Sequence, residues 1–288
     1  MSHALRAHRA SPASSMGRSL GKLAGADLAN AIEWLGWRGS QIHEGIHKSR
    51  KSLREARATL ALGGSVLGPG AELIDRELQR LNCELSGWRD GQALVDAIGR
   101  LLKRESDPER LAVLQRAQQA GADARAELGH AALAQDSPLG AMRALLGTLR
   151  LALPSLAWEA VTARTINGAL ATSGERRQKA IDRACSERKT TDWHRVRKRV
   201  RRLTQQYAVL EQLGIEEVAR PTDDVKAQEQ ELAKRLGQAQ DCVLLLDRCR
   251  EHEVFAGSDR KIVRALARRQ LKRIRRKAVR LIGDETDR

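Results

Sequence analysis

The sequence predicts an all-α fold, and three observations support that expectation. Hydrophobic residues make up 41% of the 288 residues, yet there are only one Phe, one Tyr and five Trp. The core must therefore consist mainly of Leu, Ala, Val and Ile, which suits helices packed on helices. Runs of β-branched residues are nearly absent, and apolar residues recur at helical intervals along most of the chain.

The first half of the chain is expected to contain helices at 27–35 and 40–62, then a break where residues 63–70 read GGSVLGPG. Asp107 and Pro108 have the residue types of an N-cap and a first helical position. The remaining helices expected here lie at 71–86, 90–104, 108–128 and from 138 to about 153, with shorter ones in 155–170.

The second half is expected to repeat this scheme, with Ser173-Gly174 and Gly237 as interruptions and Asp192 as an N-cap. The helices predicted are 175–188, 193–213, 223–236, 238–255 and 259–282. Together they predict one domain over 25–285, made of two helical bundles near 25–150 and 155–285. Residues 1–24 are expected to form a disordered basic tail, and an organellar targeting segment is the alternative.

Charge is the strongest compositional signal. The chain has 52 Lys and Arg against 36 Asp and Glu, a formal net charge of +16. Such an excess destabilises a compact fold unless an anion is normally bound, so nucleic acid, an anionic membrane or another polyanion is the expected partner. No apolar run approaches the ~20 residues of a membrane span.

The cysteines point to a reducing compartment, and we expect a cytoplasmic protein. They show no CxxC or zinc-ribbon spacing and lie in or beside apolar helical patterns, where a free Cys behaves as a small hydrophobe. These residues are Cys83, Cys185, Cys242 and Cys249.

A basic stripe marks the helix in which residues 47–57 read HKSRKSLREAR. At about 100° per residue, the first His and three of the cations fall within a stripe roughly 100° wide, with no acid among them. The apolar residues gather on a different face, which must be the buried one. The stripe consists of His47, Arg50, Lys51 and Arg54, and Arg57 lies one turn further on.

A second helix superimposes on the first. Residues 194–203 read HRVRKRVRRL, and aligning His194 on His47 brings both the cations and the apolar residues into register. The second stripe consists of His194, Arg197, Lys198 and Arg201, followed by Arg202. Each copy is followed by an Asp near an expected helix start, Asp90 in the first copy and Asp241 in the second. We interpret both as N-caps. A secondary role would be to orient a neighbouring Arg. The repeated register predicts an internal duplication with pseudo-twofold symmetry.

Two such stripes facing each other would repel, and a polyanion between them would relieve that repulsion. Phosphate oxygens accept forked guanidinium hydrogen bonds, and Lys adds a point charge. A His beside phosphate would have its charged form favoured, which tightens binding at acidic pH. Solvated basic faces of ordinary helices are the alternative interpretation, and the repeated register argues against it.

These motifs, HxxRKxxR followed by RD and HxxRKxxRRL followed by LGxxxD, resemble the CHAD family (conserved histidine α-helical domain) over about residues 25–285. The resemblance implies two pseudo-symmetric helical bundles that form one compact unit around a central basic groove. It also implies binding of inorganic polyphosphate and association with polyphosphate granules, through the ten residues of the two stripes and their extensions. The chain has no ExExK strand of a tunnel-type triphosphatase, so we expect a stand-alone binding module without catalytic residues, metal or cofactor.

The final helix adds further cations. Residues 260–280 contain no acid. This helix is expected either to extend the groove or to be an ordinary solvated terminal helix. The additional groove residues expected are Arg89, Arg264, Arg268, Lys272 and Arg275. Apolar helix faces could also form the interface of a homodimer.

Two other functions compete with this hypothesis. Binding of DNA or RNA along the phosphate backbone is the stronger alternative, although the stripes lack the aromatic residues on which single-stranded bases stack. A zinc hydrolase is the weaker one. His43-Glu44-Gly45-Ile46-His47 matches HExxH, but no third ligand stands at a convincing spacing, and nearby cations raise the cost of binding a dication.

Overall fold

The computed structural model describes residues 12–133, 138–187, 189–250 and 254–286, and in these ranges it is helical without a strand. The all-α fold class is therefore confirmed. The helices are α1 (Pro12–Trp34), α2 (Ile42–Gly63), α3 (Pro69–Glu84), α4 (Ser86–Leu102), α5 (Pro108–Leu133), α6 (Leu139–Ala152), α7 (Ala163–Glu187), α8 (Thr190–Gln212), α9 (Asp223–Arg248) and α10 (Gly257–Thr286). Short 3-10 helices are η1 (Gly39–Gln41), η2 (Gly64–Leu67), η3 (Leu153–Ser155) and η4 (Trp158–Ala160). Among the described helices, none is both long and apolar enough to cross a membrane.

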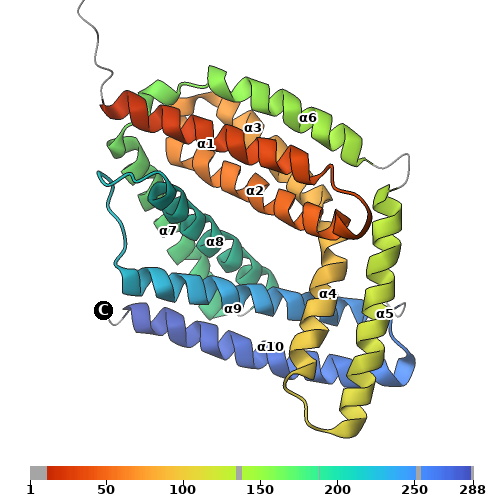
Figure 1. The fold of residues 1–288 in the computed structure, drawn as a ribbon. Helices are drawn as coiled ribbons and strands as arrows, with labels where there is room; N and C mark the ends of the chain where they lie inside the picture. The colour runs from red at the N-terminus through yellow and green to blue at the C-terminus, as the bar shows by residue number, and fades with distance from the viewer. Residues whose placement is uncertain (1–11, 134–137, 188, 251–253, 287–288) are drawn as a thin grey trace, which may run out of the picture.

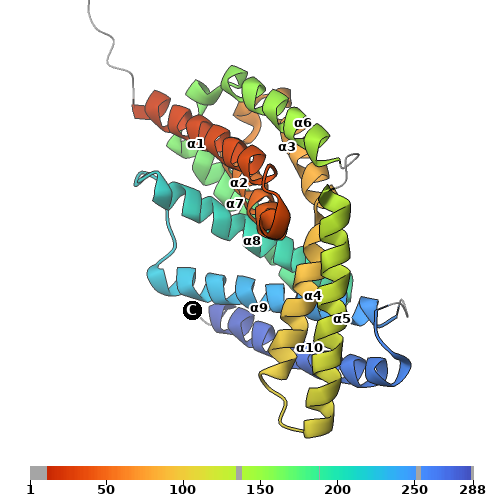
Figure 2. The ribbon, with the colours of Figure 1, turned by 45° about the vertical axis from the view of Figure 1, so that its right-hand side comes forward.

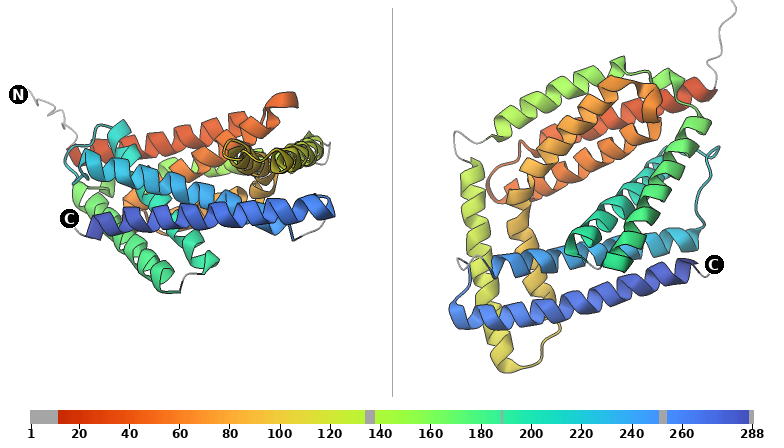
Figure 3. Two further views of the ribbon diagram at one scale, coloured as in Figure 1. Left: turned by 90° about the horizontal axis from the view of Figure 1, so that it is seen from below. Right: turned by 180° about the vertical axis from the view of Figure 1, so that it is seen from behind.

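The helices pair in the same order in both halves of the chain. In the first half α1 packs on α2 and α4 on α5, and in the second half α7 packs on α8 and α9 on α10. The halves are joined because α2 packs on α8 and α4 packs on α9 (Figure 1). Figures 2 and 3 show α4 and α5 standing across the long α9–α10 pair. This order of pairing fits the expected duplication, which stays a prediction.

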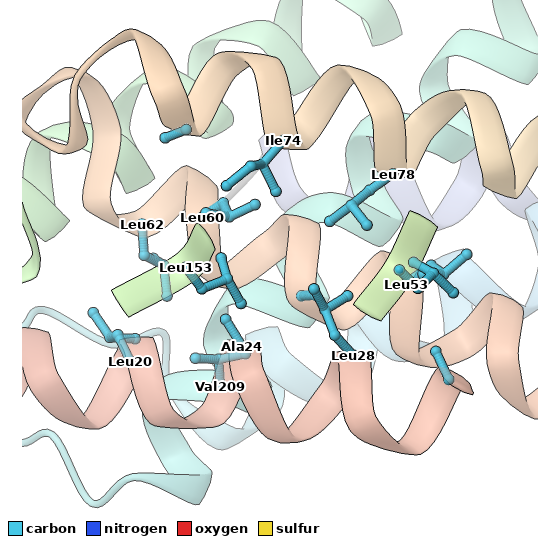
Figure 4. Packing of buried hydrophobic residues seen from close by; sticks show 14 of the residues in the cluster. Leu20, Ala24, Leu28, Leu53, Leu60, Leu62, Ile74, Leu78, Leu153 and Val209 are labelled. Atoms are coloured by element: carbon cyan, nitrogen blue, oxygen red, sulfur yellow. The ribbon is translucent and has the colours of Figure 1, made fainter. Parts of the chain in front are cut away.

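The largest apolar cluster lies between α1, α2 and α3. Figure 4 shows Leu28 of α1, Leu53 of α2 and Leu78 of α3 pointing toward one another, and all three side chains are fully buried. Val209 of α8 reaches the same cluster, so the second half of the chain contributes to the core of the first. A separate cluster packs α4 and α5 against α9 and α10.

The N-terminal helix corrects the expected boundary of the domain. α1 begins at Pro12, so residues 12–24 are helical and the disordered tail predicted for them is wrong. Met16, Leu20 and Ala24 are buried at four-residue intervals, which gives this segment an apolar stripe that tertiary packing stabilises. Residues 1–11, the rest of the predicted tail, lie outside the described residues.

Two predicted helix breaks are wrong as well. Ser173 and Gly174 lie inside α7, and Gly237 lies inside α9, which joins the two helices expected at 223–236 and 238–255. A single Gly costs about 1 kcal/mol in a helix interior. Burial of Leu236 and Ala239 on either side of Gly237 offsets that cost, because tertiary packing supplies most of the stability of a helix.

Other local signals are confirmed. Asp107 caps α5, since its Oδ1 accepts a hydrogen bond from the backbone N–H of Arg110 at 3.0 Å. Gly64 and Gly68 in the predicted break have φ of 60° and 76°, a region that glycine enters without steric cost. These features could be predicted from the sequence because a capping Asp or a glycine affects only the backbone within about one turn of its own position.

The cysteines are free thiols. Cys83 and Cys185 are exposed, whereas Cys242 and Cys249 are buried. Burial raises the pKa of the Cys242 and Cys249 thiols to about 11, so both stay protonated and behave as core residues.

Candidate anion-binding site

The two helices that carry the basic stripes belong to a closed ring of packed helices. α2 packs on α8, α8 on α9, α9 on α4, and α4 back on α2. α2 and α4 come from the first half of the chain, and α8 and α9 come from the second. Figure 1 and the rear view in Figure 3 show the ring from opposite sides. The ring therefore brings together segments that lie far apart in the sequence.

On α2 the predicted residues differ in exposure and in their partners. His47 and Lys51 are exposed, and Arg50 and Arg54 are half-buried. Lys51 Nζ lies 3.5 Å from a carboxylate oxygen of Glu55, so the stripe is not free of acids as the sequence suggested. An exposed pair of this kind contributes little stability. Lys51 therefore remains available to an anion at small cost.

Arg50 ties α2 to α3. Its Nη1 donates to the backbone carbonyl of Asn82, and the Asn82 amide donates back to the Arg50 carbonyl at 3.4 Å. This exchange holds the guanidinium end of Arg50 against α3 and fixes the position of α3 on α2.

On α8 the cations gather around the half-buried His194. Its Nδ1 shares a hydrogen bond of 2.7 Å with Gln240 Oε1 of α9, so the imidazole is directed toward the neighbouring helix of the ring. Burial lowers the pKa of His194, and the positive charges of Lys198, Arg197 and Arg201 lower it further, while the Gln240 hydrogen bond acts in the opposite direction. His194 thus lies within the positive potential of all three predicted cations of its stripe.

Arg57 and Arg202 are held at the crossing of α2 and α8. The Arg57 guanidinium donates two hydrogen bonds to the Asp75 carboxylate of α3, at 2.8 and 3.0 Å. Arg202 donates to the Arg57 carbonyl and lies 3.6 Å from the same carboxylate. Burial lowers the pKa of Arg202 although Asp75 partly compensates. The sequence predicted both arginines as unneutralised groove residues, whereas they share the Asp75 carboxylate, whose single charge balances one of the two. These contacts join the two halves of the chain, and a place for either arginine in the groove stays a prediction.

The two aspartates are not N-caps. Asp90 lies inside α4, which begins at Ser86, and Asp241 lies in the interior of α9. Asp241 is buried and its Oδ2 accepts a hydrogen bond of 2.7 Å from Arg100 of α4. The secondary role, orientation of an Arg, is therefore the one observed for Asp241. The capping prediction failed because α9 continues through Gly237.

The additional groove residues predicted from the sequence differ in exposure and in their contacts. Arg268 and Lys272 are exposed on α10, which packs on α9, and Arg264 is half-buried. Arg275 does reach a helix of the ring, since its Nη2 donates to Thr190 Oγ1 at the start of α8 at 3.0 Å. The side chain of Arg89 lies outside the described residues.

The HExxH segment does not form a metal centre with other donors of the described chain. Glu44 is engaged by Lys48 at 3.0 Å. His43 faces α5, where a Cβ added to Gly129 would lie 2.8 Å from its Nε2, and burial together with the charge of Arg125 lowers its pKa. Within the described ranges no group of three or more His, Cys, Asp and Glu is placed to hold a metal ion.

Several residues of this region had no signal in the sequence. Asp75 and Asn82 of α3 hold the arginines of α2, and Gln240 holds His194. Asp75 and Asn82 lie on a helix without a basic motif. Gln240 directly precedes the predicted Asp241, and only that neighbourhood could have suggested it.

Comparison with known proteins agrees with this architecture. The CHAD domain family matches residues 23–250, which is more than half of the chain. A crystal structure of the CHAD domain from the plant Ricinus communis is similar, with a TM-score of 0.59, 19% sequence identity and 91% of each chain covered. No curated protein sequence matched the chain. Because the family match covers more than half of the chain and includes all four helices of the ring, the chain belongs to the CHAD family.

Proposed function

We propose that this protein binds inorganic polyphosphate along the stripes of α2 and α8, as a binding protein and not as a catalyst. The stripes are His47, Arg50, Lys51 and Arg54 on α2 and His194, Arg197, Lys198 and Arg201 on α8. Association with polyphosphate granules or a role in phosphate homeostasis would follow from this binding.

The observation that carries the proposal is the cluster of positive charge around His194. Three cations lower its pKa, and they belong to a helix that packs on the other basic helix. Like charges held together in a partly buried region raise the free energy of the ligand-free protein. A bound polyanion lowers it, and a ligand that carries several charges along one flexible chain can reach several of these cations at once.

The chemistry of the residues fits phosphate. Arg presents a planar fork that matches phosphate oxygens, and Lys contributes a compact charge. A phosphate near His194 would raise its pKa from the lowered value of the ligand-free state, so binding takes up a proton and tightens as the pH falls. Longer chains engage more cations and release more counterions, so affinity should rise with chain length and fall steeply with added salt.

The test is the pair of substitutions Arg50→Glu and Arg201→Glu, measured by retention on immobilised long-chain polyphosphate. We expect retention to be lost while helical circular dichroism is unchanged. Because both arginines are half-buried, Lys51→Glu with Lys198→Glu provides a second pair at exposed positions. Unchanged retention in both pairs refutes the proposed binding surface.

The control must change the charge equally at positions outside the ring. Lys22 of α1 and Arg150 of α6 are exposed, so Lys22→Glu with Arg150→Glu separates the loss of the stripe from the loss of overall positive charge. Equal losses in the control and in the stripe variants would indicate attraction by net charge alone.

Nucleic acid is the alternative ligand, and a competition experiment decides between the two. Polyphosphate, duplex DNA, single-stranded RNA and heparin are compared at physiological salt. We expect polyphosphate to bind at least tenfold more tightly, which corresponds to about 1.4 kcal/mol. A preference for DNA or RNA would replace the proposed ligand but leave the basic surface in place.

A further inference from the structure

A pocket on another face of α8 contains arginines that the two stripes do not use. It lies where α7 and α8 meet the C-terminal part of α2. Its lining residues are Ala61, Ser173, Arg176, Arg199 and Arg202. The pocket is small and partly open to solvent, so it suits a compact ligand.

Two of the pocket arginines have no counter-ion in the described parts of the chain. Neither Arg176 nor Arg199 makes an ion pair or a hydrogen bond with another described side chain or carbonyl. Burial lowers the pKa of Arg199, and the positive charges of Arg176 and Arg195 lower it further. Arg202, in contrast, is held by Asp75 at the α2–α8 crossing.

The nearby carboxylates are already engaged by other cations. Asp192 lies 3.2 Å from Arg195 and 3.3 Å from Arg183, and Asp75 is shared by Arg57 and Arg202. The charges of Arg176 and Arg199 are therefore not balanced by these carboxylates, and an anion from solution would balance them.

This pocket is not a product of the doubled motif. Arg199 lies about 140° around α8 from His194, outside the stripe that contains Lys198 and Arg201. In the register that aligns His194 with His47, Arg199 falls on Ser52 and Arg202 falls on Glu55. The corresponding face of α2 therefore lacks these cations, and the doubled motif does not predict the arginines of this pocket.

We infer that this pocket is a second anion site, which takes a phosphoryl group with two negative charges. Two guanidinium groups without counter-ions supply forked donors, and the Ser173 hydroxyl supplies one more. The partial burial of Arg199 strengthens such contacts compared with an open surface. A terminal phosphoryl group near neutral pH carries almost two charges, whereas each internal phosphate of a chain carries one.

Two sources supply this chemistry: free orthophosphate, and the end of a polyphosphate chain whose internal phosphates lie on the stripes. The second source rests on the proposed function, and the first does not. In either case the pocket recognises the doubly charged group and not the length of the chain.

The experiment measures binding of orthophosphate and pyrophosphate by isothermal titration calorimetry in a phosphate-free buffer of fixed ionic strength. For Arg176→Gln with Arg199→Gln we expect affinity about tenfold to a hundredfold weaker than in the parent, the size expected from losing hydrogen bonds between charged groups. Lys22→Gln with Arg150→Gln removes the same charge at exposed positions of α1 and α6 and should leave the affinity unchanged.

Long polyphosphate with free ends, compared with the same chain capped at both ends as phosphoramidates, separates the two sources. If the chain end occupies the pocket, capping weakens binding to the parent but not to the double variant. If only orthophosphate occupies it, capping has no effect, and orthophosphate binding alone is lost in the variant. Both results support the pocket.

The inference is overturned if the double variant binds orthophosphate, pyrophosphate and uncapped chains like the parent. Arg176→Gln alone alters an exposed side chain, so it keeps the test valid if the double variant does not fold. The Arg50→Glu and Arg201→Glu pair tests the stripes separately: loss of long-chain binding there, with orthophosphate binding retained, would establish two independent sites.

Discussion

A buried carboxyl group between α1 and α2 should make the stability of this protein depend on pH. Asp27 is 8% exposed, and its Oδ2 is buried without a hydrogen-bond partner among the described residues. Burial, and to a smaller extent the charge of Glu55, raise its pKa from 3.8 to about 7, while the charge of Lys51 acts in the opposite direction. We therefore predict that Asp27→Asn stabilises the protein above neutral pH.

The sign follows from proton binding. The folded state holds a proton on Asp27 between about pH 4 and 7, where the unfolded state does not, so stability from this group is complete below the unfolded pKa and is lost as the pH rises through about 7. A difference of about three pH units at 1.36 kcal/mol each gives on the order of 4 kcal/mol. This is an upper value, because water near the side chain lessens the cost.

The assay is urea unfolding followed by circular dichroism at about pH 8.5 and about pH 5.5, where linkage predicts different effects. Asp27→Asn should raise the unfolding free energy by about 1–4 kcal/mol at the higher pH and by about half as much at the lower pH, where the folded carboxyl is protonated but the unfolded one is already ionised. Glu33→Gln, at an exposed position of the same helix, removes one negative charge and should show no comparable dependence. Equal effects of Asp27→Asn at both pH values would refute the reasoning.

Two further predictions concern packing. Gly45→Ala should destabilise the protein by about 1–3 kcal/mol in chemical unfolding, because the added Cβ would lie 2.4 Å from the Trp34 carbonyl oxygen. Gly25→Ala, with open space around its Cβ, should instead stabilise by about 0.5–1 kcal/mol, and a gain at both positions would contradict the close approach of α1 and α2. Arg177→Met removes the guanidinium partner of the buried Glu229 carboxylate and should cost about 3–5 kcal/mol, most of it recovered when Glu229→Leu is added. A double variant as unstable as the single one would show that the pair has another role.

The sequence by itself determined the fold class and most of the helices. A core limited to small aliphatic residues, apolar residues at helical intervals and the glycines at 64 and 68 all act over one or two turns, and no distant contact is needed to interpret them. The two basic stripes were also predictable, because positions on one helix face follow from the helical repeat alone.

Only the tertiary structure decided how these helices continue and what their charges contact. The helix through Gly237 and the early start of α1 at Pro12 follow from burial against other helices, which outweighs local penalties of about 1 kcal/mol. Asp75 neutralises Arg57, and Arg199 lies beside Arg176 of α7, because helices far apart in the sequence pack together. Such contacts leave no periodic signal in the sequence. For that reason only the tertiary structure distinguishes the cations that join the two halves from the cations that are available to bind an anion.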